Sequence, residues 1–261
     1  MSPPTGALYL VPTPLDFGTA ETAERGATDW LPASTLAVAA RLSHWVTENA
    51  KSTRAFLKRV DAVAGLAAPL QAMTITELPR AAHKHGDHRP DAALDAQARA
   101  LIAPALAGHD VGLVSEAGMP AVADPGSAVV RAAHAAGVRV VPLVGPVSLV
   151  LALAASGMNG QAFAFVGYVP QAAADRQRRL RELEARARDT GETQVLIETP
   201  YRNAALLDAL LQTLKGDTRL AVAVGLGLTD ERVVSLPVAT WRQRGTAGLA
   251  LDRPAVFLIG R

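Results

Sequence analysis

The sequence predicts an α/β protein built from two α/β domains with mixed sheets. Apolar runs rich in Val, Leu and Ile alternate along the chain with segments of helical periodicity. Residues that commonly begin or end helices stand between these segments. Near the middle of the chain, a Gly-Pro turn separates a strand from the helix that follows it. Strands that alternate with helices are typical of parallel or mixed sheets that helices cover.

The predicted strands form one set in each half of the chain. Each strand is a short apolar run that turn-forming residues bound. The expected ranges are 7–11, 43–47, 73–77, 111–115 and 138–143, followed by 163–167, 193–198, 219–224, 231–236 and 255–259.

Helices are expected in most of the gaps between these strands. The clearest starts are Asp124, predicted as an N-cap with Pro125 at the first helical position, and Thr199 with Pro200. Glycines at the predicted helix ends are expected to adopt the left-handed conformation that closes a helix; they are Gly137, Gly157 and Gly216.

The stretch VVPLVGPVSL, residues 140–149, predicts the domain boundary. It ends one strand, turns at Gly145–Pro146 and begins a helix. We therefore expect an N-terminal domain over 1–144 and a C-terminal domain over 145–261.

Composition excludes several classes of site. The chain has 261 residues, a formal net charge of +2 and no cysteine, so disulfides, thiolate metal sites and a Cys nucleophile are excluded. We expect no metal site. The start of the sequence lacks a signal-peptide pattern, and no run of about 18 apolar residues could span a bilayer. A cytoplasmic location is the resulting expectation.

The stretch LVSEAGMPAVADPG, residues 113–126, is the leading candidate for a ligand-binding loop. It runs from the carboxyl end of a predicted strand to the start of a predicted helix. Ligands of α/β proteins bind at such edges, and the free N–H groups of a helix start favour negative charge. Small residues also suit a plain connection between a strand and a helix, so pattern alone leaves both interpretations open.

This loop resembles the S-D-A-G-T-P-x-x-x-D-P-G signature of the tetrapyrrole methylase superfamily, whose members are S-adenosylmethionine-dependent methyltransferases. Further stretches are similar to family motifs in the same order: GALYLVPTP (6–14), VRVVPLVGPVSLVLALAASGM (138–158), FAFVGYVP (163–170) and LIETPYR (196–202). Within the superfamily, the chain most resembles the small-subunit ribosomal RNA methyltransferase I subfamily, which methylates a cytidine ribose 2′-oxygen.

The resemblance implies a cleft between the two domains that holds S-adenosylmethionine, with no metal. It also implies homodimers and a ribosomal RNA acceptor. Glu48 is the candidate catalytic residue on the acceptor side. The implied donor-binding residues are Pro12, Ser115, Glu116, Ala117, Gly118, Met119, Pro120, Gly145, Pro146, Ser148, Tyr168, Glu198, Leu226 and Gly227.

Motifs on the acceptor side depart from the family pattern. The family's P-I-G-N-L-x-D reads PLDFGTAET here, its A-E-D-T-R-x-T reads TENAKSTRAFL, and its A-R-E-L-T-K reads AVGLGLTDE. Two alternatives therefore stay open. The acceptor could be a tetrapyrrole or another small molecule, or the chain could bind the donor without catalysis.

Two further segments have a functional and a structural interpretation. HKHGDH, residues 83–88, could face the acceptor or form a solvated loop. The predicted helix over 174–189 holds six arginines against four acidic residues. It could contact RNA phosphates, or it could be a solvated helix with ion pairs at helical spacing, such as Arg178 with Glu182.

Overall fold

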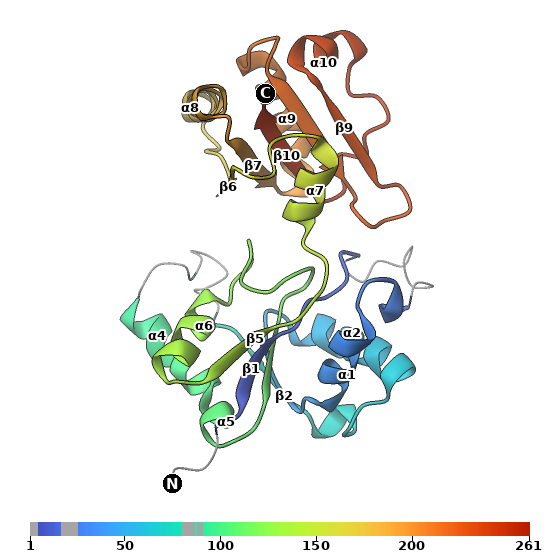
Figure 1. The fold of residues 1–261 in the computed structure, drawn as a ribbon, viewed down its shortest axis with the longest axis vertical. Helices are drawn as coiled ribbons and strands as arrows, with labels where there is room; N and C mark the ends of the chain where they lie inside the picture. Colours follow the sequence, from blue (N-terminus) through green and yellow to red (C-terminus); the bar gives the residue numbers. More distant parts are fainter. Residues whose placement is uncertain (1–4, 17–25, 80–86, 88–90) are drawn as a thin grey trace. The chain divides into compact units, whose positions relative to one another are not determined.

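The computed structural model describes residues 5–16, 26–79, 87 and 91–261 (Figure 1). The chain divides into two compact units, Met1–Pro146 and Val147–Arg261. This division lies two residues after the boundary expected from the Gly145–Pro146 turn.

The sheet of the first unit has five strands in the order β3-β2-β4-β1-β5, and all of its neighbouring strands pair in parallel. The α/β class is confirmed, and the pairing in this unit is more uniform than the mixed pairing expected for both sheets. Its central strands are buried on both faces, which explains why they read as continuous apolar runs in the sequence. The strands are β1 (Ala7–Leu10), β2 (His44–Thr47), β3 (Thr74–Glu77), β4 (Val111–Val114) and β5 (Arg139–Pro142).

Helices cover both faces of this sheet (Figure 1). The short 3-10 segments η2 (Ala27–Asp29) and η3 (Leu70–Ala72) accompany α1 and α2 on one face, where Trp45, Leu57 and their neighbours form one core cluster. A second cluster around Leu113 and Val129 lies under the helices of the other face. The helices are α1 (Ala33–Arg41) and α2 (Ala50–Ala64) on the first face, and α4 (Ala92–Leu101), α5 (Ala103–Leu106) and α6 (Ser127–Ala135) on the second.

The sheet of the second unit is mixed, with the order β6-β7-β10-β8-β9. Only β6 and β7 pair in parallel; the other neighbouring strands are antiparallel. The strands are β6 (Phe163–Gly167), β7 (Thr193–Glu198), β8 (Arg219–Val224), β9 (Arg232–Pro237) and β10 (Ala255–Gly260).

Alternate residues of these strands face two separate cores. Phe257 packs in a large cluster with Leu180, Leu206 and Trp241, which come from the helices of one face. Its neighbour Leu258 packs with residues of α7 on the opposite face. One face carries α7 (Ser148–Ser156) alone. The other face carries α8 (Ala173–Thr190), α9 (Asn203–Thr213) with the 3-10 segment η4 (Pro200–Arg202), and α10 (Val238–Arg244).

Every predicted strand is present to within a residue or two at its ends. The helix ends were predicted less well. Gly137 and Gly157 have φ of +70° and +71° and follow α6 and α7 as expected, but Gly216 has no such backbone and α9 already ends at Thr213. Thr199 precedes the segment η4, and its side chain makes no capping hydrogen bond. Within the described ranges, no helix combines the length and the apolar character needed to cross a membrane.

Candidate functional site

The carboxyl ends of β1 and β4 form the topological switch point of the first sheet. These strands are neighbours, but the helix after β1 packs on one face of the sheet and the helix after β4 packs on the other. The chain after each strand therefore leads to a different face of the sheet, and open parallel sheets bind ligands at such positions. The loops are 11–16 after β1 and 115–126 after β4, so the candidate loop of the sequence lies at this position.

Backbone contacts join the two loops. Thr13 N–H donates to the Gly118 carbonyl at 2.9 Å, and Gly118 N–H donates to the Thr13 carbonyl at 3.0 Å. The Thr13 hydroxyl also donates to the Ser115 carbonyl at 3.3 Å. Gly118 has a φ of +76°, which favours glycine at this point of the turn. The bridge fixes the start of the β4 loop against the β1 loop.

The loop after β5 packs against the same place. A Cβ on Gly145 would lie 2.2 Å from Cγ of Pro12, so only glycine allows this close approach. Pro146 also lies near, with its carbonyl oxygen 3.6 Å from the Cβ position of Gly118. The structure thus brings together the donor-binding residues predicted in the first unit, which are Pro12, Ser115, Glu116, Ala117, Gly118, Met119, Pro120, Gly145 and Pro146.

The second half of the β4 loop holds unusual backbone conformations. Ala121 and Ala123 have φ of +63° and +68°, and Gly126 has φ of +137°. A left-handed alanine costs on the order of 1–3 kcal/mol, and such residues gather at functional sites. The loop is held in a conformation that its local sequence does not favour.

Carboxylates from β2 and β4 meet at this edge. Oε2 of Glu48, directly after β2, accepts a hydrogen bond from the backbone N–H of Glu116 at 3.4 Å. Oε1 of Glu116 accepts from Nδ2 of Asn49 at 2.9 Å. The other side of Asn49 caps α2, because its Oδ1 accepts from the N–H groups of Lys51 and Ser52. Glu48, the predicted catalytic residue, therefore lies at the β4 loop and binds its backbone.

Asp124 completes this group of acids and has a strongly shifted pKa. Burial raises the pKa of Asp124 from its ordinary value of 3.8 to about 7, with the negative charges of Glu48 and Glu116 acting in the same direction. The Ser115 hydroxyl faces the Asp124 carboxyl and lowers this pKa in part. Its geometry falls short of a hydrogen bond, so the buried Ser115 Oγ has no hydrogen-bond partner in the part of the chain that the structure describes.

Asp124 is not the N-cap of the following helix, which corrects the sequence prediction. The helix α6 begins at Ser127, and its cap residue is Gly126. The capping carboxylate comes from Asp87, whose Oδ2 accepts from the N–H groups of Gly126 and Ala128 at 2.8 and 3.0 Å.

Asp87 was predicted only as part of the histidine-rich segment, and it is buried. The other residues of that segment, His83, His85 and His88 among them, lie outside the described residues. The sequence separation of 39 residues between Asp87 and Gly126 explains why local pattern could not reveal this contact.

The predicted donor-binding residues of the second unit share one edge of its sheet. Tyr168 follows β6 and is 57% exposed, Glu198 ends β7, and Leu226 and Gly227 follow β8. These three strands run in the same direction, so their carboxyl ends lie at a common edge. Ser148 is the first residue of α7, whose preceding residue Val147 packs in the same cluster as Leu226.

Two of these residues are held by local contacts. Oε1 of Glu198 lies 2.7 Å from Nη2 of Arg202 and also accepts from the Thr199 N–H at 2.7 Å. Gly227 N–H donates to Oε2 of Glu231 at 2.6 Å, which fixes the turn after β8. Glu198 therefore organises the start of η4, a structural duty that the sequence did not predict.

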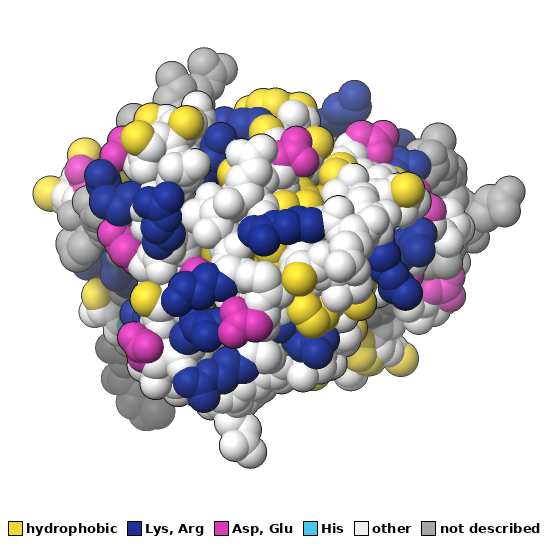
Figure 2. All heavy atoms as spheres, turned by 90° about the horizontal axis from the view of Figure 1, so that it is seen from above, with side chains coloured by type: hydrophobic (Ala, Val, Ile, Leu, Met, Phe, Trp, Pro, Cys, Tyr) yellow, Lys and Arg dark blue, Asp and Glu magenta, His cyan; other side chains and the backbone are white. Residues whose placement is uncertain are grey.

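The arginines of α8 divide into paired and unpaired groups. Arg178 pairs with Asp175 at 2.8 Å and Arg179 pairs with Glu182 at 3.2 Å, so the expected pair of Arg178 with Glu182 is wrong. Arg186 and Arg188 pair with acids beyond the helix, Glu192 and Asp217. Among the described residues, Arg176 and Arg181 have no acidic partner. Figure 2 shows acidic side chains interspersed among the basic ones on one face of the molecule.

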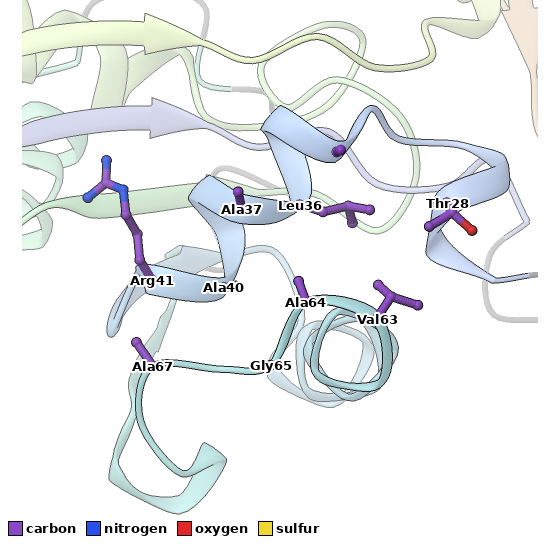
Figure 3. A pocket seen from close by; sticks show the side chains of 10 residues that line it. Thr28, Leu36, Ala37, Ala40, Arg41, Val63, Ala64, Gly65 and Ala67 are labelled. Atoms are coloured by element: carbon purple, nitrogen blue, oxygen red, sulfur yellow. The ribbon is translucent and has the colours of Figure 1, made fainter.

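One pocket of the first unit lies between α1 and α2 and has a volume of about 360 Å³ (Figure 3). Alanines and Leu36 make up much of its lining, and Arg41 is the only charged residue among the described residues that line it. The Arg41 guanidinium pairs with Asp110, just before β4, and lies 4.9 Å from the centre of the Tyr9 ring. None of the predicted site residues lines this pocket, and the Arg41 guanidinium is already paired with Asp110.

Comparison with known proteins identifies the family. The family model for Tetrapyrrole (Corrin/Porphyrin) Methylases matches residues 50–241. The chain belongs to this family. The matched range includes the loop 115–126 and Gly145.

Named relatives and solved structures agree with this assignment. The chain is 30% identical over 233 residues to the Ribosomal RNA small subunit methyltransferase I of Escherichia coli O157:H7, covering 89% of this chain and 70% of the relative. It is 39% identical over 132 residues to the protein of that name from Pseudomonas aeruginosa, covering 51% and 45%. The match spans about half the length of several such relatives.

The fold resembles the crystal structure of the methyltransferase CobJ, with a TM-score of 0.56, 18% identity and coverage of 98% and 95%. It also resembles uroporphyrin-III-C-methyltransferase from Thermus thermophilus, with a TM-score of 0.51, 21% identity and coverage of 98% and 92%. At these identities the likeness concerns the fold.

Proposed function

We propose that this protein is an S-adenosylmethionine-dependent methyltransferase that methylates a ribose 2′-hydroxyl of ribosomal RNA. The observation that carries the proposal is the loop 115–126 at the switch point, with its family signature and its close packing against Pro12 and Gly145. Family membership and the names of the relatives support a methyltransferase and a ribosomal RNA acceptor.

The residues at this edge suit the proposed donor, which carries a sulfonium and an ammonium group. Glu48 and Glu116 supply negative charge there, and Ser115 supplies a buried hydroxyl that bonds to no described residue. Gly118 and Gly145 have no side chain, so other parts of the chain can lie close to their backbone. The site therefore offers charge, an unused polar atom and a fixed backbone to a cationic ligand.

The donor, when bound, supplies an activated methyl group, so the protein's main task is alignment. The bridge between Thr13 and Gly118 holds the two switch-point loops in register. Glu48 binds the Glu116 N–H and so fixes the start of the β4 loop from the β2 side. Ser148, Tyr168, Glu198, Leu226 and Gly227, all in the second unit, stay predictions for further donor contacts.

Donor binding is tested by thermal unfolding with S-adenosylmethionine and S-adenosylhomocysteine. A ligand that binds only the folded state raises the Tm by mass action, so both compounds should stabilise the wild type. Gly118→Trp should abolish the shift, because the side chain would fill the space at Leu15 and Pro146. The Arg181→Ala variant on α8 serves as a matched control that keeps the shift. An unchanged wild-type Tm at millimolar ligand contradicts the donor site.

The acceptor is tested by methylation of total RNA with isotopically labelled donor, followed by nucleoside analysis. The expected product is a 2′-O-methylated nucleoside in small-subunit ribosomal RNA. Label in a small molecule, or donor binding without any transfer, would favour the two alternatives left open by the sequence.

A further inference from the structure

We propose that Asp124 accepts the proton that the acceptor hydroxyl releases during methyl transfer. This inference rests on the proposed function, because it names the proton acceptor of that reaction. It differs from the sequence prediction, which made Asp124 a helix cap and Glu48 the catalytic residue.

Among the residues that the structure describes, no helix cap or ion pair explains a carboxylate at Asp124. Asp87 already caps α6 through Gly126 and Ala128. Asp124 forms no ion pair with an Arg or Lys among the described residues. A half-buried carboxylate that neither caps a helix nor pairs with a cation lowers the stability of the fold. Such unfavourable groups are typical of functional sites.

The groups around Asp124 come from several elements of the first unit. Glu48 lies after β2, Glu116 and Ser115 lie in the β4 loop, and Asp87 approaches the start of α6 from the segment before α4. Ser115 is 4% exposed, and its hydroxyl has no hydrogen-bond partner among the described residues. That hydroxyl favours the charged form of the Asp124 carboxyl, whose pKa it lowers.

Glu48 and Glu116 accept hydrogen bonds that hold neighbouring structure, which gives both a positioning role. The Glu48 carboxylate accepts from the loop backbone, and the Glu116 carboxylate accepts from Asn49. Their charges instead act on Asp124, where they make the carboxylate a better proton acceptor. Glu48 is thus a positioning residue in this proposal.

The step balances in atoms and charge. The acceptor oxygen forms a bond to the methyl carbon, and the bond from that carbon to sulfur breaks with its electrons going to sulfur. The hydroxyl proton passes to the Asp124 carboxylate, which becomes neutral. A carboxyl whose pKa lies near the working pH is well matched to this task, and such groups contribute about 10²–10⁴-fold to rate.

The test is the pH dependence of single-turnover methylation of ribosomal RNA at saturating donor. The wild-type rate should rise with pH and level off above about 7, as Asp124 loses its proton. Asp124→Asn should lower the rate about 10²–10⁴-fold and remove this rise. Donor affinity, measured by the Tm shift, should stay within a few-fold of wild type.

Two neighbouring variants should move the midpoint of the pH profile in opposite directions. Glu48→Gln removes a like charge and lowers the pKa of Asp124, so the midpoint moves to lower pH. Ser115→Ala removes the hydroxyl that lowers this pKa, so the midpoint moves to higher pH. A residue with only a structural role would not produce these opposite shifts.

A titration of Asp124 by carboxyl ¹³C NMR in the free protein gives a readout that is independent of activity. Its midpoint should move in the same directions in the two variants. An Asp124→Asn enzyme with wild-type rate and pH profile overturns the inference and leaves the proposed function intact. A wild type that binds the donor but methylates no RNA overturns the proposed function instead.

Discussion

Replacing Asp124 by Asn should stabilise the protein at alkaline pH and leave it unchanged in strong acid. The substitution keeps the shape of the side chain and removes its charge. In the folded protein burial favours the neutral acid, whereas in the unfolded chain the carboxyl ionises near 3.8. The raised pKa therefore costs stability as the pH rises from about 4 to 7, and above 7 the full cost applies.

The size of the effect follows from the interval between the two pKa values. The step from 3.8 to about 7, at 1.36 kcal/mol for each pH unit, sets an upper limit of about 4 kcal/mol. Asp124 is only partly buried, and solvent screens part of this cost. We expect Asp124→Asn to raise the free energy of unfolding by roughly 1–3 kcal/mol at pH 8.

Urea unfolding at pH values between 3 and 9 measures this directly. The curves of wild type and Asp124→Asn should coincide below about pH 4 and separate steadily up to about pH 7. The matched control is Asp95→Asn on α4, a partly exposed acid in an ion pair with Arg131 that should bring no alkaline gain. If Asp124→Asn destabilises the protein at pH 8, the carboxylate is favourably bound there and the reasoning fails.

Three further outcomes follow from the described contacts. Asp87→Ala should lower the free energy of unfolding by about 1–2 kcal/mol in urea titrations, because α6 is then without its cap; an unchanged value would contradict the capping role. If α8 binds RNA, the double variant Arg176→Glu with Arg181→Glu should bind RNA more weakly. The slope of its affinity against salt concentration should flatten by about 0.7 for each phosphate that is no longer neutralised. Replacement of the ion-paired Arg178 and Arg179 by Ala should have a smaller effect. We also propose a homodimer, so light scattering should give about twice 27.2 kDa, and a monomer at micromolar concentration would refute this.

The strands could be predicted because their burial shapes the sequence directly. Strands covered on both faces, such as β4, require continuous apolar residues. The run at 111–114 shows this pattern, so the strand can be recognised even when its neighbours in the sheet are unknown. The position of the candidate site also comes from the sequence, since the 115–126 loop follows a strand and resembles a family signature, and its role in binding stays a prediction. What the sequence could not show was which loops Thr13 and Gly145 contact.

The error at Asp124 has a specific physical cause. The order Asp-Pro-Gly resembles a cap followed by the first helical residue, which is a local signal. Gly126, with a φ of +137°, instead redirects the chain so that α6 begins at Ser127. The cap then comes from Asp87, far away in the sequence, and no local pattern encodes that choice.

The distribution of charge is consistent with the two tasks that the proposed reaction requires. The switch-point edge of the first unit gathers Glu48, Glu116 and Asp124, which suits a cationic donor and a departing proton and disfavours phosphate. In the second unit, α8 carries arginines that have no acidic partner among the described residues, which suits phosphate and not a sulfonium. A net charge of only +2 therefore includes an acidic edge on the first unit and, on the second, two arginines of α8 that no described acid neutralises. A methyltransferase whose acceptor is a polyanion needs such cations, because the acidic edge that favours the donor would repel the RNA.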